Sequence, residues 1–545
     1  MIRNGFTLLF VWLLAFCLGG CGRQPLKLSL SAEVERPERS AVIFFVDGLD
    51  EARLDELLAA GRLPNIQKRF VDGGVHVENA VAAVPAMTYP NSVSLFTGCF
   101  PGHHGVLGNQ VFDRVRLTWI DYITLEHYLR VNQDFSRATI YEMLNDRLTV
   151  NVQCHTHRGV THSFDNMLET GPAWYIGLHI PVNQYVASCL EQIAAMAERV
   201  RKWPVLTTFY FPGLDAAGHA QGSQSDYYAQ VLEDVDHQIG RVTNAMESAG
   251  LLDSSYLALV TDHGHPRSDK AESFDLIDWL KKERKIRCHH GPVPGATYAD
   301  RFEFLDQYDV MLVDGSHRRV MLYLRGEDGW GKRATASQIA AFIGASENQP
   351  GPSIEGLPAI EFVCRRLGEN SVEVRAAAGR LAVERRIAGS LKEYRIVSNG
   401  NQTFDLIGPP TSAETEAFDA FGWHDSQAWL RRTARSKHPD FIPQIVELFD
   451  SSAAGDVMIF MAHDYVLAGH GGGEHGSCLA ADMRIPMYFA GPDLPGGSAV
   501  ECGRIVDVVP TILDFLGAAD RLERFPTIDG VNLAPQVRDA ATPAP

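Results

Sequence analysis

The sequence lacks an excess of basic residues. Of its 545 residues, 49 are lysine or arginine and 67 are aspartate or glutamate, so the formal net charge is -18. Binding to the phosphate backbone of DNA or RNA needs a basic surface, and this balance therefore excludes a nucleic-acid polymer as a partner. An acidic protein that handles phosphate must acquire positive charge locally, and metal ions are one source of that charge.

Closely paired cysteines are absent as well. After residue 21 none of the cysteines lies at the short spacing of a zinc-thiolate site, which excludes that kind of structural zinc. Their number is odd, so at least one has no partner within the chain, and the pairing of the others stays open. These cysteines are Cys99, Cys154, Cys189, Cys288, Cys364, Cys478 and Cys502.

The apolar run near the N-terminus is too short to span a membrane. It occupies residues 6–16, follows Arg3 and leads into "LGGC", which ends at Cys21. This pattern predicts a signal peptide over residues 1–21. The small residues before Cys21 resemble a bacterial lipobox, which implies cleavage there, lipidation of the Cys21 thiol and a lipid-anchored protein of the cell envelope, on its periplasmic or outer-membrane face. An ordinary secretory signal with an incidental Cys21 is the alternative.

Short apolar runs alternate with amphipathic segments along the rest of the chain. Residues 41–46 (AVIFFV) predict a strand buried on both faces, followed by a helix with Asp50 as N-cap and Gly61 past its end. Similar runs occupy 205–211 and 256–260, and a helical pattern lies between them at 226–250. Two more runs, "DVMIFMAHD" and "IPMYFAG", follow near the C-terminus. This alternation predicts an α/β fold.

Polar residues stand where three of these runs end. They are Asp47, Asp215 with His219, and Asp262 with His263. Ligands of open α/β sheets bind beyond the carboxyl ends of the strands, so we expect these side chains to lie close together. Asp215 and His219 are four residues apart, which lets one helical turn point both at one metal ion. Taken singly, each pair also has an ordinary explanation, as a solvated pair or a helix cap.

A further histidine, His475, lies in the glycine-rich segment "GHGGGEHGS", which could also be a flexible surface turn. Together with "MTYPNSVSLFTGCFPGHHGVLGN" around Thr88, "VDG", "DAAGHAQG" and "TDHGH", it resembles the nucleotide pyrophosphatase/phosphodiesterase family of the alkaline phosphatase superfamily. The resemblance covers residues 40–265 and 440–530. It implies a three-layer αβα sandwich with a largely parallel central sheet and an inserted smaller lobe.

The resemblance also implies two zinc ions, for which Mn2+ or Mg2+ could substitute. One ion would be held by Asp215, His219 and His475, and the other by Asp47, Asp262, His263 and the hydroxyl of Thr88. A divalent cation lowers the pKa of a coordinated hydroxyl, which explains how a threonine can act as the nucleophile. Two such cations can also stabilise the attacking and leaving oxygens of an in-line displacement.

Two residues near Thr88 are expected to contact the substrate. The asparagine that ends this segment in the family, here Asn109, donates to a phosphoryl oxygen, although an ordinary turn asparagine is the alternative. Tyr89 would lie beside the substrate by adjacency, or it could be a packed core tyrosine. We interpret His103, His104 and His470 as loop structure.

More than two hundred residues separate His263 from His475, more than the simplest family members need. We therefore expect a tether at 22–38, a catalytic domain at 39–265 and 441–540, and an inserted cap-like lobe at 266–440. Strand patterns at 318–326 and 370–387 and a helical pattern at 335–344 indicate that the lobe is folded. It would lie over the mouth of the site, with a scaffold extension remote from the site as the alternative.

The expected activity is hydrolysis of phosphodiester or pyrophosphate bonds in a small substrate of nucleotide or lipid head-group type, through a phosphothreonine on Thr88. A phosphomonoesterase needs an extra cation, and no arginine lies between Arg69 and Arg114, although Arg267 or a residue of the lobe could supply one. A phosphomonoesterase or phosphonate hydrolase of the same superfamily is one alternative. A lipid-anchored binding protein without activity is another. Nothing in the sequence indicates an oligomeric state.

Overall fold

The computed structural model describes residues 24–266, 271–344, 352–389, 391–398, 406–408, 417–468 and 473–541. The expected signal peptide with Cys21, as well as Arg267 and His470, lies outside the described residues. Within the described part of the chain, no helix has both the length and the apolar character needed to cross a membrane.

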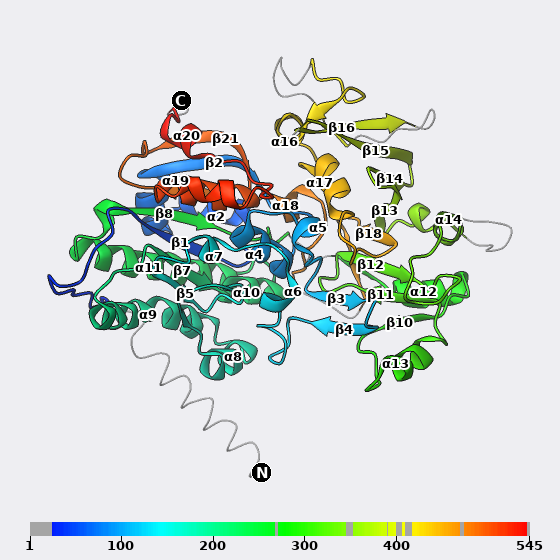
Figure 1. Cartoon of the computed structure of the whole chain (residues 1–545), viewed down its shortest axis with the longest axis horizontal. Coiled ribbons are helices and arrows are strands. Elements are labelled where there is room, and N and C mark those ends of the chain that lie inside the picture. Colours follow the sequence, from blue (N-terminus) through cyan, green and yellow to red (C-terminus); the bar gives the residue numbers. More distant parts are fainter. Residues whose placement is uncertain are drawn as a thin grey trace, which may run out of the picture.

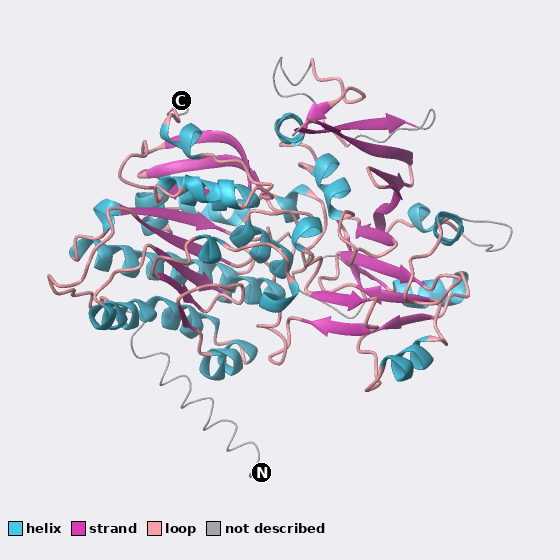
Figure 2. Cartoon of the chain, viewed as in Figure 1, coloured by secondary structure: helices cyan, strands magenta, loops and turns pink. Residues whose placement is uncertain are grey.

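An eight-stranded sheet forms the centre of the larger unit, on the left in Figures 1 and 2. All neighbouring strands run parallel except the two pairs made by β20. The structure therefore confirms the expected α/β fold with a largely parallel central sheet. The strand order is β21 (Ser498–Arg504), β2 (Gly74–Val81), β20 (Met487–Ala490), β8 (Ser255–Val260), β1 (Ser40–Val46), β7 (Leu206–Phe211), β5 (Thr149–Val152) and β6 (His162–Phe164).

Strand β1 separates two apolar cores. Phe45 and its alternate neighbours contact the core that includes α4 (Thr88–Thr97), α7 (Ile140–Met143) and α19 (Val508–Phe515). Phe44 and its alternate neighbours contact the core of α2 (Glu51–Ala59), α9 (His179–Val200) and α11 (Asp226–Ser248). Because successive side chains of a strand point to opposite faces, a strand between two helical layers must be apolar throughout. This explains the unbroken run AVIFFV and produces three layers.

The helix after β1 begins as the sequence predicts. The Asp50 side chain caps α2 by accepting a hydrogen bond from the backbone N–H of Arg53 (2.8 Å). Gly61 follows the end of α2 with φ of +68°. The predicted helix at 226–250 is α11, and its buried side chains, Val235 and Ile239 among them, recur at three and four residues.

The segment expected as a tether, 22–38, packs against the larger unit over its described residues. Leu26 and Val34 are buried in the same core as α9. The backbone N–H of Lys27 donates to Glu191 (2.8 Å), and the Ser31 hydroxyl donates to Glu198 (2.8 Å). Leu28 and Leu30 are partly buried against the same core, so leucines at every second position hold this segment in place. Its polar composition did not indicate this packing.

A second, nine-stranded sheet lies on the right in Figure 1 and includes the strands predicted at 318–326 and 370–387. Strand β18 lies C-terminal to the expected lobe boundary at residue 440, yet it pairs antiparallel with β12 and β13. An apolar run marks a strand but does not say which sheet it joins. The order is β10 (Cys288–His290), β11 (Val310–Val313), β12 (Arg319–Leu324), β18 (Val457–Met461), β13 (Ile360–Gly368), β14 (Ser371–Ala376), β15 (Gly379–Ala388), β16 (Leu391–Ser398) and β17 (His424–Asp425).

The remaining elements are shorter, and the helix predicted at 335–344 is among them, as α14. The helices are α3 (Pro64–Ile66), α5 (Pro101–His104), α6 (Val131–Asp134), α8 (Met167–Tyr175), α10 (Gly213–Gln221), α12 (Leu276–Glu283), α13 (Tyr298–Leu305), α14 (Ala336–Ile343), α16 (Ser426–Thr433), α17 (Phe441–Leu448), α18 (Ala480–Met483) and α20 (Ala534–Arg538). Two small two-stranded sheets pair β3 (Gln110–Asp113) with β4 (Thr118–Asp121), and β9 (Glu272–Phe274) with β19 (Tyr465–Leu467).

A buried network of charges joins the two units around His103, which lies in helix α5 rather than in a loop. His103 Nδ1 lies 2.6 Å from Asp529, and Nε2 lies 2.9 Å from Glu447 and 3.1 Å from Asp450. Burial alone would lower the pKa of His103, but the bonds to Asp450, Asp529 and Glu447 raise it to about 11. Arg385 also pairs with Glu447 and Asp450. The acidic groups of this network are therefore balanced by side-chain cations.

Replacing His103 by glutamine should lower the free energy of unfolding by about 2 kcal/mol, because the three carboxylates around it each lose a charged hydrogen-bond partner. Arg385 and Lys392 still pair with Glu447, which keeps the loss from being larger. The raised pKa makes the stabilisation complete below pH ~6.5, the ordinary pKa of histidine. Stabilisation is then lost as the pH rises toward about 11. Denaturant unfolding of wild type and His103→Gln should thus differ most at pH 6 and least near pH 10. A gap that stays constant with pH contradicts the assignment; His463→Gln, at an exposed ion pair, is the control.

Candidate metal centre

Three neighbouring strands bring the candidate ligands to one edge of the central sheet. Strands β8, β1 and β7 are adjacent and parallel, so their carboxyl ends meet. Asp47 follows β1 directly, and Asp262 and His263 follow β8. Helix α10 begins after β7 and carries Asp215 and His219 one turn apart. The convergence that the strand endings predict is therefore present in the structure.

Two of the three aspartates use one carboxylate oxygen in hydrogen bonds within the protein, and the third lies beside a histidine. Asp47 Oδ2 accepts a hydrogen bond from the Tyr210 hydroxyl. Asp262 Oδ1 accepts from the backbone N–H of Gly48 (3.1 Å) and of His263 (3.1 Å). Asp215 Oδ2 lies 3.3 Å from His219 Nε2.

The other oxygen of each aspartate is buried and has no hydrogen-bond partner. These atoms are Asp47 Oδ1, Asp215 Oδ1 and Asp262 Oδ2. A buried carboxylate oxygen without a partner is costly, and a bound cation removes that cost. The described residues therefore fit bound metal ions, because these unpaired carboxylate oxygens belong to aspartates that lie close to histidine nitrogens in candidate ligand groups.

Electrostatics supports the same conclusion. Burial, followed by the charges of Asp262 and Asp215, raises the pKa of Asp47 well above its ordinary range. Burial also raises the pKa of Asp262. Burial acts in the same direction on Asp215, but the neighbouring His219 and His475 outweigh it and lower the pKa of Asp215. Three carboxylates this close repel one another unless positive charge lies between them.

The histidines of the predicted set share one arrangement. In each, Nδ1 donates to a backbone carbonyl, which leaves the lone pair of Nε2 available to a metal ion. These bonds join His219 to Gly473 (2.7 Å), His475 to Ala86 (3.0 Å) and His263 to Gly264 (3.1 Å). The Nε2 atoms face carboxylates: that of His475 lies 3.7 Å from Asp215 Oδ1, and that of His263 lies 3.5 Å from both Asp47 Oδ1 and Asp262 Oδ2.

Three overlapping groups of ligand atoms result, each with its atoms within 4.8 Å of one another. They are Asp47 with Asp262 and His263, Asp215 with His263 and His475, and Asp215 with His219 and His265. Sequence reasoning missed His265. The available signal was the second histidine of "TDHGH", which follows the same strand end.

Thr88 is the first residue of helix α4 and lies beside these groups. Its Oγ1 is 3.1 Å from His263 Nε2. The turn before it is held by Asn91, whose side chain bonds to the backbone of Ala83, Pro85 and Met87. A helix N-terminus presents free N–H groups and a positive dipole end, so an anion beside Thr88 would be stabilised.

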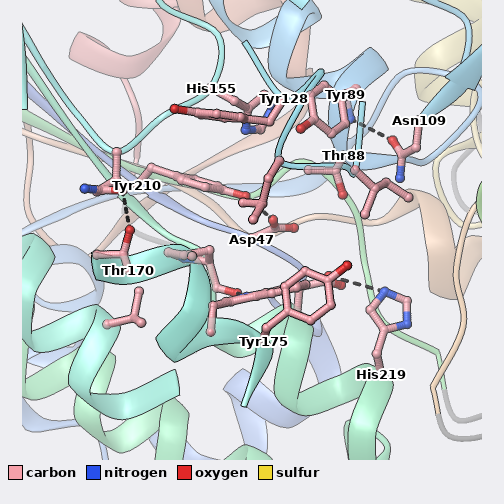
Figure 3. A pocket seen from close by; sticks show the side chains of 18 of the residues that line it. Asp47, Thr88, Tyr89, Asn109, Tyr128, His155, Thr170, Tyr175, Tyr210 and His219 are labelled. Atoms are coloured by element: carbon pink, nitrogen blue, oxygen red, sulfur yellow. Dashed lines mark hydrogen bonds and ion pairs between the residues drawn. The ribbon is translucent and has the colours of Figure 1, made fainter. Parts of the chain in front are cut away.

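Asn109 and Tyr89 are connected by a hydrogen bond that Figure 3 marks. The backbone N–H of Tyr89 donates to Asn109 Oδ1 (3.0 Å), so the side-chain NH2 of Asn109 remains available to a ligand in the cavity. The Tyr89 hydroxyl donates to the carbonyl of Tyr122 (2.6 Å), and its ring lies against Tyr122 and His155. Tyr89 is thus packed, and what it presents to the cavity is ring surface.

A cavity of about 480 Å3 opens over Thr88 and the candidate ligands. Its far wall is apolar and aromatic, with side chains from two segments: Ile123, Leu125 and Tyr128, and Met167, Trp174 and Tyr175. Ser316 and His317, in the connection between β11 and β12, also line it, so the second unit contributes to the cavity. No lysine or arginine occurs among the described residues that line it.

Comparison with known proteins gives a consistent result. Residues 41–331 match the family model described as type I phosphodiesterase/nucleotide pyrophosphatase. The matched range contains six of the seven predicted ligand and nucleophile positions; His475 lies outside it. The match also extends into the second unit, beyond the range 40–265 over which the sequence motifs resemble the family.

Individual relatives match about half of this chain. Ectonucleotide pyrophosphatase/phosphodiesterase family member 1 of Rattus norvegicus is 24% identical over 284 residues, which is 50% of this chain and 30% of the rat protein. Family member 5 of Homo sapiens is 26% identical over 223 residues, 40% of this chain and 44% of the human protein. The bis(5'-adenosyl)-triphosphatase enpp4 of Mus musculus is 22% identical over 274 residues, 48% of this chain and 55% of that protein. The chain thus spans between 30% and 55% of the length of these relatives.

Metal binding should be visible as thermal stabilisation. Zinc added to chelator-treated protein at a hundred times its Kd should raise the free energy of unfolding by about 2.7 kcal/mol. Asp262→Asn weakens one group of ligands and should lose part of this gain in a thermal unfolding assay. Asp464→Asn, at a largely exposed aspartate, should keep all of it. An equal gain in Asp262→Asn and wild type would contradict the assignment.

Proposed function

The chain belongs to the type I phosphodiesterase/nucleotide pyrophosphatase family, and from this premise we propose that it hydrolyses phosphodiester or pyrophosphate bonds through a covalent intermediate on Thr88. One observation carries the proposal. Thr88 Oγ1 lies at the start of α4 and 3.1 Å from His263 Nε2, which belongs to the ligand group of Asp47, Asp262 and His263. An ion held by this group would therefore have the Thr88 hydroxyl within reach.

Zinc is the cofactor that the donor set favours, since imidazole nitrogens and carboxylate oxygens are its usual ligands in catalytic sites. Asp215, His219 and His475 would hold one ion, and Asp47, Asp262, His263 and Thr88 the other. When bound, the ions would supply positive charge that lowers the pKa of the Thr88 hydroxyl and offsets the charge of the phosphoryl group.

The side chains of the chain then have separate tasks. Thr88 Oγ1 forms a bond to phosphorus as the bond from phosphorus to the leaving oxygen breaks, which gives phosphothreonine and the first product. Water subsequently attacks phosphorus and breaks the bond to Thr88, which restores the hydroxyl and releases the second product. The NH2 group of Asn109 and the backbone N–H of Thr88 donate to non-bridging oxygens, where negative charge builds up in the transition state.

The wall opposite Thr88 supports an organic leaving group with a flat or apolar part. Tyr128, Trp174 and Tyr175 present aromatic surface to the cavity, and Tyr175 is 66% exposed, so its ring is accessible to a ligand. A nucleobase would stack on such rings, and the apolar part of a lipid head-group ester would lie along Ile123 and Leu125. We therefore propose nucleotide or lipid head-group diesters as the substrate class.

A phosphomonoester carries one more negative charge than a diester and needs an additional cation. The described residues that line the cavity include no lysine or arginine, which favours diesters. Arg267, which the sequence offers for this role, lies outside the described residues. The alternative of a non-catalytic binding protein is disfavoured because the nucleophile and every predicted ligand are retained around one cavity.

The location that we propose is the cell envelope, with the lipid on Cys21. The support for it is the sequence "LGGC" together with the short apolar run before it. Since residues 26–34 pack along α9, an anchor at Cys21 would hold the α9 side of the larger unit close to the membrane surface.

Substitution of Thr88 tests the nucleophile. Thr88→Ala removes the hydroxyl and should reduce kcat/KM for an aryl phosphodiester by roughly a thousandfold or more, with metal content unchanged. Thr88→Ser keeps a hydroxyl and serves as the matched control, which should retain activity within about tenfold. Unchanged turnover of the aryl phosphodiester by Thr88→Ala at normal metal occupancy would contradict the proposal.

Comparing matched aryl esters on the zinc-loaded wild type tests the substrate class. A diester preference of about a hundredfold or more in kcat/KM, near 2.7 kcal/mol of discrimination, is the expected result. The reason is the lack of a fixed cation among the described lining residues. A preference for the monoester would show that a phosphatase site is completed by a cation from elsewhere in the chain.

Asn109 can be tested without disturbing its structural bond. Asn109→Asp keeps an oxygen for the backbone N–H of Tyr89 but replaces the NH2 donor, so kcat should fall by roughly a hundredfold to a thousandfold, with a smaller effect on KM. Asn244→Asp is the control, because Asn244 is exposed on α11, does not line the cavity and keeps an acceptor for Arg69 when replaced by aspartate. If Asn109→Asp turns over diesters at the wild-type rate, Asn109 is a turn residue and nothing more.

A further inference from the structure

His265 is a buried histidine beside the candidate metal centre that no motif assigns. It follows Asp262 and His263 in the loop after β8 and is 0% exposed. Neither of its ring nitrogens makes a well-aligned hydrogen bond, and the backbone group near them is that of the adjacent residue Pro266. Burying such an imidazole costs free energy, because its hydrogen bonds to water are lost and are not replaced, unless a bound ion or ligand interacts with it.

The carboxylate oxygen that faces His265 also lacks a hydrogen-bond partner. His265 Nε2 lies 3.6 Å from Asp215 Oδ1, which is buried and also without a hydrogen-bond partner. This separation is too long for a hydrogen bond. Two ligands at about 2.0–2.1 Å from a tetrahedral zinc ion lie roughly 3.3 to 3.4 Å apart. The pair therefore has close to the spacing of two ligands on one ion.

Two glycines make room for the imidazole. A Cβ atom on Gly218 would lie 2.4 Å from His265 Nε2, and a Cβ on Gly473 would lie 2.1 Å from its Cε1. Both are closer than real side chains approach, so any residue other than glycine would displace the ring. The same two residues flank His219: Gly218 precedes it in α10, and the carbonyl of Gly473 accepts its Nδ1 hydrogen bond. His219 and His265 are thus held by one frame, with ring centroids 5.2 Å apart.

We propose that His265 is an additional protein ligand, through Nε2, of the ion that Asp215 and His219 hold. The ligand atoms of these three residues lie within 4.8 Å of one another. The inference rests on the proposed metal-dependent function, because it assumes that an ion is bound at Asp215. It adds one protein ligand to that ion. With His475, the ion would have three imidazole nitrogens and one carboxylate, whereas the ion at Asp47 and Asp262 would have mainly oxygen ligands.

This asymmetry has a consequence for metal choice. Imidazole nitrogen favours zinc strongly over Mg2+ and Mn2+, and carboxylate and hydroxyl oxygens discriminate much less. The Asp215 site should therefore keep its zinc when the Asp47 site has exchanged its ion for Mg2+ or Mn2+. Chelation should remove the two ions in separate steps, the one at Asp47 first.

The test measures metal binding directly. Chelator-treated wild type and His265→Leu are titrated with zinc against a chromophoric chelator, and the visible absorption of Co2+-loaded samples is recorded. Wild type should bind two ions, and His265→Leu should bind one of them at least about tenfold more weakly with an altered cobalt spectrum. His104→Leu replaces a buried histidine bonded to Ser94 and is the control, with both properties unchanged.

The outcomes separate this inference from the proposed function. Two ions with wild-type affinity and spectrum in His265→Leu would overturn the role of His265 alone. A wild-type protein that binds no ion would overturn both. If His265→Leu does not fold, the count of paramagnetically shifted imidazole N–H signals in cobalt-loaded wild type decides: four such signals support a fourth histidine ligand and three exclude it.

Discussion

Three buried carboxylates, those of Asp47, Asp215 and Asp262, meet at the ends of three adjacent parallel strands. Each has one buried oxygen without a partner, and Asp47 and Asp262 have the other oxygen hydrogen-bonded within the protein. Burial and mutual repulsion make this arrangement unfavourable on its own, and positive charge between the carboxylates is what relieves it. Gly48 allows the three carboxylates to lie close together: its φ is +63°, and a Cβ atom at this position would lie 2.7 Å from Asp215 Oδ1. A side chain at this position would separate Asp215 from the other two.

Segments far apart in the sequence hold Thr88, the proposed nucleophile, beside the candidate ligand His263. Asn91 and Gln444 satisfy the backbone of the turn before Thr88, and the latter comes from α17, which packs on the second sheet. The Nδ1 of His475 donates to Ala86 in the same turn. This hydrogen bond orients His475, a candidate metal ligand, and also holds the backbone just before Thr88. The position of the Thr88 hydroxyl is therefore coupled to that of the candidate ligand.

The second unit is therefore part of the site as well as an addition to it. It lines the cavity with Ser316 and His317, and the charge network around His103 ties β15 and β16 to the segment between Thr88 and Asn109. The aromatic wall comes instead from α8 and the loop after β4 in the larger unit. In the proposed function, the reacting groups and the surface for the leaving group thus come from different segments, so the second could vary without changing the first.

The sequence by itself determined the strands, because an unbroken apolar run such as residues 41–46 reports burial on both faces, and it placed Asp47, Asp262 and His263 because they directly follow such runs. It also placed Asp215 and His219 on one face of a helix by their spacing. The family resemblance of the glycine-rich segment added His475. Only the tertiary structure decided that His265 joins them, that β18 enters the second sheet, and that residues 26–34 pack along α9. Local periodicity records how a segment is buried, whereas the partners of that segment depend on complementary packing between distant parts of the chain, which no single stretch of sequence contains.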